Sequence, residues 1–144
     1  MNQAELQALA EARVQDAKAL IDGGRADLGY YIAGYAVECA LKSCTLARMI
    51  HTGWIYREDV KKIDECRVHD FKKLVQIAGL TDALNARLKE SAAARDGFVE
   101  NWDTVNEWDV ASRYVLNQPK DAKKLYAAIT DEPHGVLRWI RNYW

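Results

Sequence analysis

Two ionisable residues stand out because they lie in an otherwise apolar stretch of the chain. Glu38 and Lys42 are four residues apart in the run YIAGYAVECALKS, residues 31–43. In a helix this spacing puts both side chains on one face, with the acid on the N-terminal side, an order that favours an ion pair. If Glu38 faces the core, its carboxylate needs a partner, and we expect a tyrosine or an arginine from another helix. The simpler interpretation is a structural ion pair, and the alternative is a ligand contact or an acid–base group.

His69 and Asp70 form a second candidate pair at the start of a predicted helix. Histidine exchanges a proton near neutral pH, so His69 could act as an acid or a base. Asp70 is explained more simply as a carboxylate that interacts with the helix dipole. The other two histidines, His51 and His134, are far away in the sequence, and we expect no metal site.

Arg113 and Tyr114 form a third candidate pair, between a tryptophan-rich segment and a loop. The planar guanidinium group of Arg113 is suited to binding phosphate. It could equally pair with Glu38, or with Asp109 one turn earlier, and this structural interpretation is slightly favoured.

Aromatic residues are frequent, and the chain ends in the run Trp-Ile-Arg-Asn-Tyr-Trp. Tryptophan can stack on nucleic-acid bases, but it belongs more often to a core or to the centre of an interface. We expect core and dimer contacts, with Trp139, Tyr143 and Trp144 as a candidate interface.

These candidates must be positioned by helices, because apolar residues recur at spacings of three and four and no strand-like alternation occurs. Gly97 is expected to break or bend one helix, and the segment 100–114 either continues it or forms a separate turn. A long connection, 51–68, has a possible helical turn at 58–65. The predicted helices are 3–22, 25–50 at the centre of the core, 69–79, one capped by Thr81, 120–130, and a last one with Pro133 in its first turn.

The composition predicts one folded domain over residues 1–144, built as an all-α, up-and-down antiparallel bundle of four long helices with short ones appended. Apolar residues make up 49% and charged residues 28%, and the net charge is −1, which argues against a strongly basic nucleic-acid-binding surface. Three cysteines and no visible signal or membrane segment predict reduced thiols in a cytoplasmic protein, with Cys39 and Cys44 as small buried residues. No cofactor motif is present, and no cofactor is expected.

The order of these motifs resembles the HEPN (higher eukaryotes and prokaryotes nucleotide-binding) family. YIAGYAVECALKS resembles the aromatic "YAxExALK" run of its second helix, HDFKKL at residues 69–74 resembles "HxLxxL", and Arg113-Tyr114 resembles an "RY" of members without nuclease activity. The ending VLRWIRNYW resembles the last helix of the family. The resemblance implies a dimeric bundle of four or five helices, and it marks Glu38, Lys42, His69, Arg113 and Tyr114 as the ligand-binding residues.

Catalytic members of this family cleave RNA with an arginine followed, four to six residues later, by a histidine. This chain departs from that pattern, because Arg48 and Arg67 precede a histidine too closely and Arg113 has none before His134. We therefore expect no catalytic residues of that kind and an enzyme only in an unusual form.

Three functions follow, in order of preference. The first is a non-catalytic binding module for a nucleotide, a nucleic acid such as RNA, or a nucleotidyltransferase-like protein, in a toxin–antitoxin or defence context. The second is a structural homodimerisation domain. The third is a ribonuclease with a rearranged site, in which His69 and Arg113 meet across a homodimer cleft.

Overall fold

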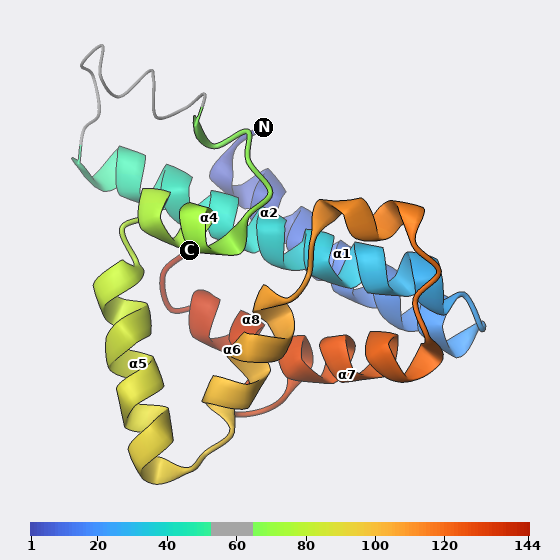
Figure 1. Cartoon of the computed structure of the whole chain (residues 1–144). Helices are drawn as coiled ribbons and strands as arrows, with labels where there is room; N and C mark the ends of the chain where they lie inside the picture. The colour runs from blue at the N-terminus through green and yellow to red at the C-terminus, as the bar shows by residue number, and fades with distance from the viewer. Residues whose placement is uncertain (53–64) are drawn as a thin grey trace.

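All regular elements of the part of the chain that the structure describes are helices (Figure 1). The structure is a computed structural model, and it describes residues 1–52 and 65–144. The prediction of an all-helical fold is confirmed, and no described helix is long and apolar enough to span a bilayer. The helices are α1 (Gln3–Asp22), α2 (Ala26–Thr52), α4 (Phe71–Ile77), α5 (Thr81–Ala94), α6 (Phe98–Asn106), the 3-10 helix η1 (Val110–Tyr114), α7 (Pro119–Thr130) and α8 (Val136–Ile140).

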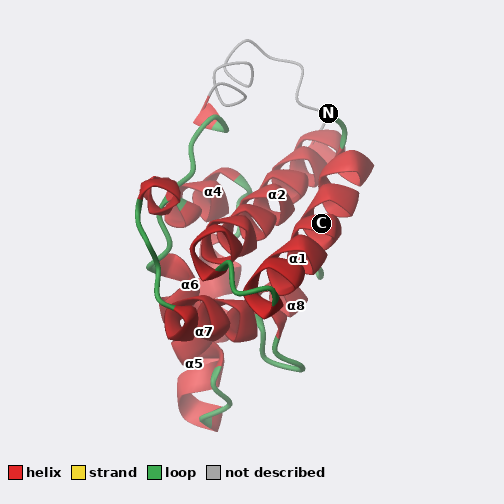
Figure 2. Cartoon of the chain, turned by 90° about the vertical axis from the view of Figure 1, so that its right-hand side faces the viewer, coloured by secondary structure: helices red, strands yellow, loops and turns green. Residues whose placement is uncertain are grey.

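Helices α1 and α2 form an antiparallel hairpin and lie side by side (Figure 2). Asn2 caps α1 through its side chain, which accepts from the backbone N–H of Glu5, while the Glu5 carboxylate accepts from the backbone N–H of Asn2. This reciprocal arrangement satisfies two N–H groups that the first turn leaves free. Gly24 then adopts a positive φ of 77°, which allows the tight turn into α2.

The second helix lies at the centre of the fold, as its sequence predicts. It packs against α1, α4, η1, α7 and α8. Ala33, Ala36 and Ala40 are at most 1% exposed, and such small side chains let the neighbouring backbones come close.

Trp108, in the segment between α6 and η1, packs on two helices, α2 and α4. Its indole stacks on Phe71 of α4, with ring centroids 5.1 Å apart, and on Tyr31 of α2, at 6.0 Å. The same indole lies directly against Gly34, where a larger residue would collide with it. The aromatic stack therefore fixes the start of α4 against α2, and with it the segment just before α4, which contains His69 and Asp70.

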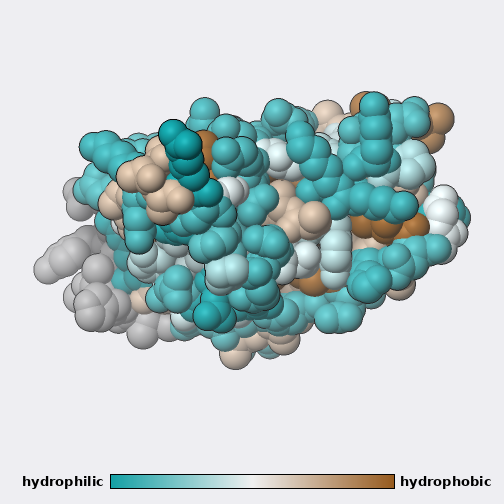
Figure 3. All heavy atoms as spheres, turned by 90° about the horizontal axis from the view of Figure 1, so that it is seen from below, coloured by the Kyte–Doolittle hydropathy of each residue, from teal (hydrophilic) through white to brown (hydrophobic). Residues whose placement is uncertain are grey.

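Helix α5 packs mainly on α4 and α6 and lies apart from α1, α2 and α7 (Figure 1). For this reason, the predicted bundle of four long up-and-down helices is not confirmed. The break at Gly97 is confirmed, since Arg95 and Gly97 both have positive φ values between α5 and α6. Viewed from the side of α5 and α7, the surface is mostly hydrophilic, with apolar residues in small areas (Figure 3).

Two predicted helix starts are wrong. Leu80, not Thr81, occupies the N-cap position of α5, and no side chain caps this helix. The last helix begins at Val136 rather than near Pro133, because a turn closed by the Gly135 N–H on the Asp131 carbonyl comes first. Segment 100–114 does not continue α5, which ends at Ala94; its first part belongs to the separate helix α6, and η1 follows as a separate short element. The predicted turn at 58–65 lies almost entirely outside the described residues.

Candidate functional site

The buried carboxylate of Glu38 contacts a lysine and a histidine side chain. Glu38 is 2% exposed; its Oε1 accepts a hydrogen bond from Lys42 Nζ at 2.6 Å, and its Oε2 lies 2.8 Å from His69 Nδ1. The predicted Glu38–Lys42 pair is confirmed. The expectation of a tyrosine or arginine partner is wrong, since the third group is an imidazole.

His69 reaches Glu38 because it immediately precedes α4. Asp70 is the N-cap of that helix, where its Oδ1 accepts from the backbone N–H of Lys73 at 2.7 Å. The prediction that Asp70 serves the helix start is therefore confirmed. Phe71 follows and is held by the stack on Trp108, so the two residues after His69 are both fixed.

The cluster leads from the core to the surface. The side chain of His69 is 48% exposed and that of Lys42 is 24% exposed, whereas Glu38 is inaccessible. A ring nitrogen that faces a carboxylate carries the proton, which leaves Nε2 as the nitrogen that Glu38 does not engage. The Lys42 ammonium has three donors, of which Glu38 takes one. The arrangement can bind an oxyanion or move a proton at His69.

The thiols near this helix are not nucleophiles. Burial raises the pKa of the Cys39 thiol, and it raises the pKa of Cys44 to about 12. Burial also raises the pKa of Cys66. All three are therefore neutral thiols near pH 7. The prediction that Cys39 and Cys44 are small buried residues is confirmed, and within residues 1–52 and 65–144 no group of His, Cys, Asp or Glu is arranged to hold a metal ion.

Arg113 and Tyr114 belong to η1 and lie near Tyr31 of α2 rather than near Glu38. With Asp27 and Tyr31 they line a hollow of about 190 Å³. Tyr31 precedes Glu38 by seven residues, which is roughly 10 Å along the helix. Among the described residues no ion pair joins Arg113 to Glu38 or to Asp109, and its guanidinium carbon instead lies 4.8 Å from the centre of the Tyr114 ring. The structure therefore divides the five predicted ligand residues into a group of three and a group of two.

The aromatic residues at the C-terminus differ in exposure. Trp139 is 5% exposed and packs against Phe98 and Tyr143, so it belongs to the core of this chain. Tyr143 is 38% exposed, and Trp144 is partly buried with Arg141 near its ring. Of the predicted interface, mainly Tyr143 and Trp144 offer surface to a partner.

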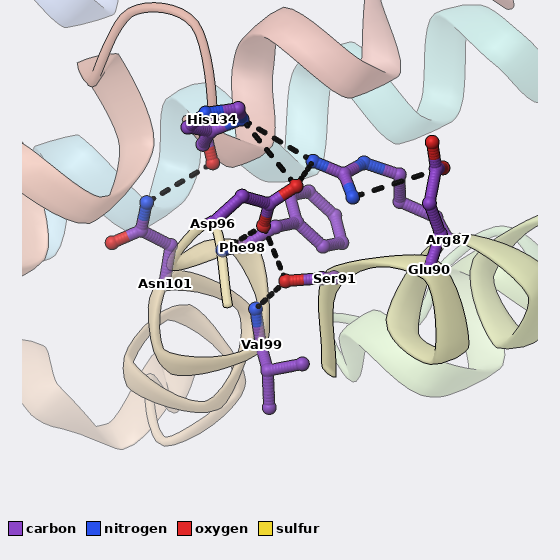
Figure 4. A network of polar contacts seen from close by, with 8 residues as sticks. All are labelled: Arg87, Glu90, Ser91, Asp96, Phe98, Val99, Asn101 and His134. Atoms are coloured by element: carbon purple, nitrogen blue, oxygen red, sulfur yellow. Dashed lines mark hydrogen bonds and ion pairs between the residues drawn. The ribbon is translucent and has the colours of Figure 1, made fainter. Parts of the chain in front are cut away.

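One polar network was not predicted from the sequence. Arg87 and Ser91 of α5 converge on Asp96, in the turn before α6, and His134 joins them from the turn before α8 (Figure 4). Arg87 Nη2 donates to Asp96 Oδ2 at 2.8 Å and lies 3.4 Å from His134 Nδ1. The only signal in the sequence was the Asp96-Gly97 pair, which is typical of a turn but does not indicate the partners.

Searches with this chain find no matching family model and no significantly similar curated protein or solved structure. The HEPN resemblance therefore stays a prediction, and the geometry of the site has to carry the functional argument.

Proposed function

We propose that this protein is a non-catalytic binding module and that the Glu38–Lys42–His69 cluster is part of its ligand site. The proposed ligand is a nucleotide or a short nucleic acid, in line with the resemblance to the HEPN family. One observation carries the proposal: side chains 31 residues apart in sequence, Glu38 and His69, meet at 2.8 Å, with Lys42 on the other oxygen of the same buried carboxylate.

The charges of this cluster favour a phosphate group. The Glu38 carboxylate fixes the positions of the Lys42 ammonium and the His69 ring. The Lys42 ammonium and the His69 ring are partly exposed, and the two remaining donors of the ammonium can bind phosphate oxygens without first being ordered. On η1, which packs against α2, Tyr114 is 79% exposed next to Arg113, and its ring offers a surface on which a base can stack.

A calorimetric titration tests this proposal with AMP, ATP, GTP, NAD and a short single-stranded RNA as the probes. Lys42→Met removes the ammonium group, and we expect it to weaken binding of the best probe by about tenfold, the effect of one charged hydrogen bond. Lys18→Met is the matched control, because Lys18 also pairs with an acid four residues away, Asp22, at 2.6 Å, but on the surface of α1. It should bind as the wild type does.

The outcomes separate clearly. Binding that Lys42→Met and His69→Gln weaken and Lys18→Met leaves unchanged supports the proposal. Binding that all three variants retain contradicts the location of the site. If none of the five probes binds at millimolar concentration, the proposed ligand class is wrong.

A second candidate function has its own observation. The Glu38–His69 contact at 2.8 Å resembles a carboxylate–imidazole dyad, in which the acid orients the histidine for proton transfer. RNA cleavage by such a site needs His69 as acid or base. Incubation of labelled RNA with the wild type and with His69→Gln tests it, since intact RNA with the wild type, or equal cleavage by both proteins, rejects this function.

A further inference from the structure

A second hollow lies between α5 and the C-terminal segment, and it shares no residue with the Glu38 cluster. Its volume is about 470 Å³, within the range of roughly 300–1,000 Å³ that small-molecule sites occupy. Its lining combines two guanidinium groups with aromatic rings. The residues that matter for the argument are Arg87, Glu90, Arg138, Trp139 and Tyr143.

Arg87 is held rigidly at the edge of this hollow. Its Nη2 atom donates to Asp96, and its guanidinium carbon lies 4.6 Å from the centre of the Phe98 ring (Figure 4). Asp96 is fixed in turn, because its Oδ1 accepts from Ser91 Oγ at 2.5 Å and from the backbone N–H of Phe98 at 3.0 Å. These hydrogen bonds, with Arg87, hold the pKa of Asp96 well below its usual range, so the anchor stays charged.

The other terminal nitrogen of Arg87 lacks an acceptor. Within the part of the chain that the structure describes, Nη1 is buried and makes no hydrogen bond. Glu90 Oε2 lies 3.8 Å from it, beyond hydrogen-bond distance, and the Glu90 side chain is 72% exposed (Figure 4). A buried guanidinium donor without an acceptor is unfavourable, so an oxyanion that reached Nη1 would gain free energy.

The rest of the hollow favours a flat apolar group. Trp139 stands at a tilt to Phe98 on one side and to Tyr143 on the other, with ring centroids 5.9 and 5.3 Å away. Aromatic rings pack well on such tilted neighbours. Arg138 lines the hollow as well; its side chain is 58% exposed, and it adds positive charge.

We propose that this hollow binds a small aromatic oxyanion, that is, a planar ring that carries a carboxylate or a phosphate ester. The ring packs against Trp139 and Tyr143, and the oxyanion accepts hydrogen bonds from Arg87 Nη1. Glu90 opposes this binding, because its carboxylate lies on the same side of Arg87 and repels a second negative charge.

Four probes test the proposal in NMR titrations of the isotope-labelled protein: benzoate, phenyl phosphate, benzyl alcohol and acetate. We expect benzoate or phenyl phosphate to shift the indole signal of Trp139 in a saturable way, with a dissociation constant on the order of 1 mM for so few atoms. Benzyl alcohol lacks the charge and acetate lacks the ring, so each should bind at least about tenfold more weakly. Whichever of these two binds more tightly shows whether the hollow prefers a carboxylate or a phosphate ester.

Two variants make the test specific. Arg87→Met should weaken binding by about tenfold or more, but it also removes a contact that joins α5 to α6, so its fold must be checked by circular dichroism. Glu90→Gln changes an exposed side chain and should strengthen oxyanion binding by roughly threefold, because it removes the repelling charge. Glu100→Gln, an equivalent change on α6 outside the hollow, should have no effect.

The proposal is overturned if neither benzoate nor phenyl phosphate gives saturable shifts at concentrations about tenfold above that dissociation constant. It is also overturned if benzyl alcohol binds as tightly as benzoate, or if Glu90→Gln leaves oxyanion binding unchanged or weaker.

Discussion

The substitution Gly34→Ala tests how Trp108 packs on the central helix. A Cβ atom at position 34 would lie 2.2–2.4 Å from Nε1, Cε2 and Cδ1 of the Trp108 indole. Ordinary carbon contacts are about 3.5–4.0 Å, so the ring or the helix would have to move by more than about 1 Å. The ring has little room, because Trp108 is 5% exposed and stacks on both Phe71 and Tyr31.

The size of the effect follows from two opposing contributions. An extra methyl group in a well-packed core costs about 1–3 kcal/mol, and this contact belongs at the upper end. Replacing glycine by alanine inside a helix gains about 1 kcal/mol. The free energy of unfolding should therefore fall by about 2 kcal/mol, and the melting temperature by roughly 8 °C for a chain of this length.

Urea unfolding and thermal melts, followed by circular dichroism, measure this loss. The matched control is Gly29→Ala in the same helix, where the new Cβ would lie 2.7 Å from the Ile21 Cγ1 atom, part of a side chain that can rotate, and 3.3 Å from the Ile21 backbone nitrogen. That variant should lose clearly less stability than Gly34→Ala, because its backbone contacts are about 1 Å longer than those with the Trp108 ring. If Gly34→Ala is as stable as the wild type, or if both variants lose the same stability, the reasoning about Trp108 is refuted.

Three further predictions concern single turns. Asp96→Asn should make the stability of the protein depend less on pH at acid pH. The pKa of Asp96 is lowered in the folded state, so its ionised carboxylate stabilises the fold above a pH of about 4 and this contribution is lost as the pH falls. Urea unfolding at several pH values measures the difference. Asp70→Ala should destabilise the protein by about 1 kcal/mol, the usual cost of losing an N-cap, and equal urea midpoints for both proteins would contradict this. Arg95→Gly should raise the free energy of unfolding by up to about 1 kcal/mol, because Arg95 has a φ of 55° that glycine adopts without strain. The melting temperature should rise accordingly, and a lower melting temperature would count against this reasoning.

Local sequence determines much of this fold. Helix α1 has the predicted limits because its signals lie in the sequence itself: Asn2 and Glu5 at the start, and two glycines after the end. The central place of α2 was predictable because an apolar surface on nearly all sides needs neighbours on nearly all sides. By contrast, Thr81 has the chemistry of a cap but lies one residue inside its helix, and no local pattern distinguishes the two positions.

The candidate site was predictable to the extent that it is local. The Glu38–Lys42 pair depends only on helix geometry, and the sequence indicated it correctly. The third member depends on where α4 packs, which the stack of Phe71 on Trp108 determines through contacts distant in sequence. A tyrosine or an arginine was the expected partner of the buried acid, but the segment before α4 places His69 there instead.

The Arg87 network shows the limit of reading a sequence by local pattern, and it also clarifies how the two sites differ. Arg87 and His134 are 47 residues apart, and neither residue lies in an unusual local pattern. At Glu38 both carboxylate oxygens have a partner, so a ligand there can use only the spare donors of Lys42 and His69. At Arg87 one buried nitrogen has no acceptor among the described residues, so a ligand there would complete a polar group that the folded chain leaves unsatisfied. Loss of Arg87 should therefore weaken the fold and ligand binding together, and loss of Lys42 should also weaken the fold, because it leaves one oxygen of the buried Glu38 carboxylate without a partner.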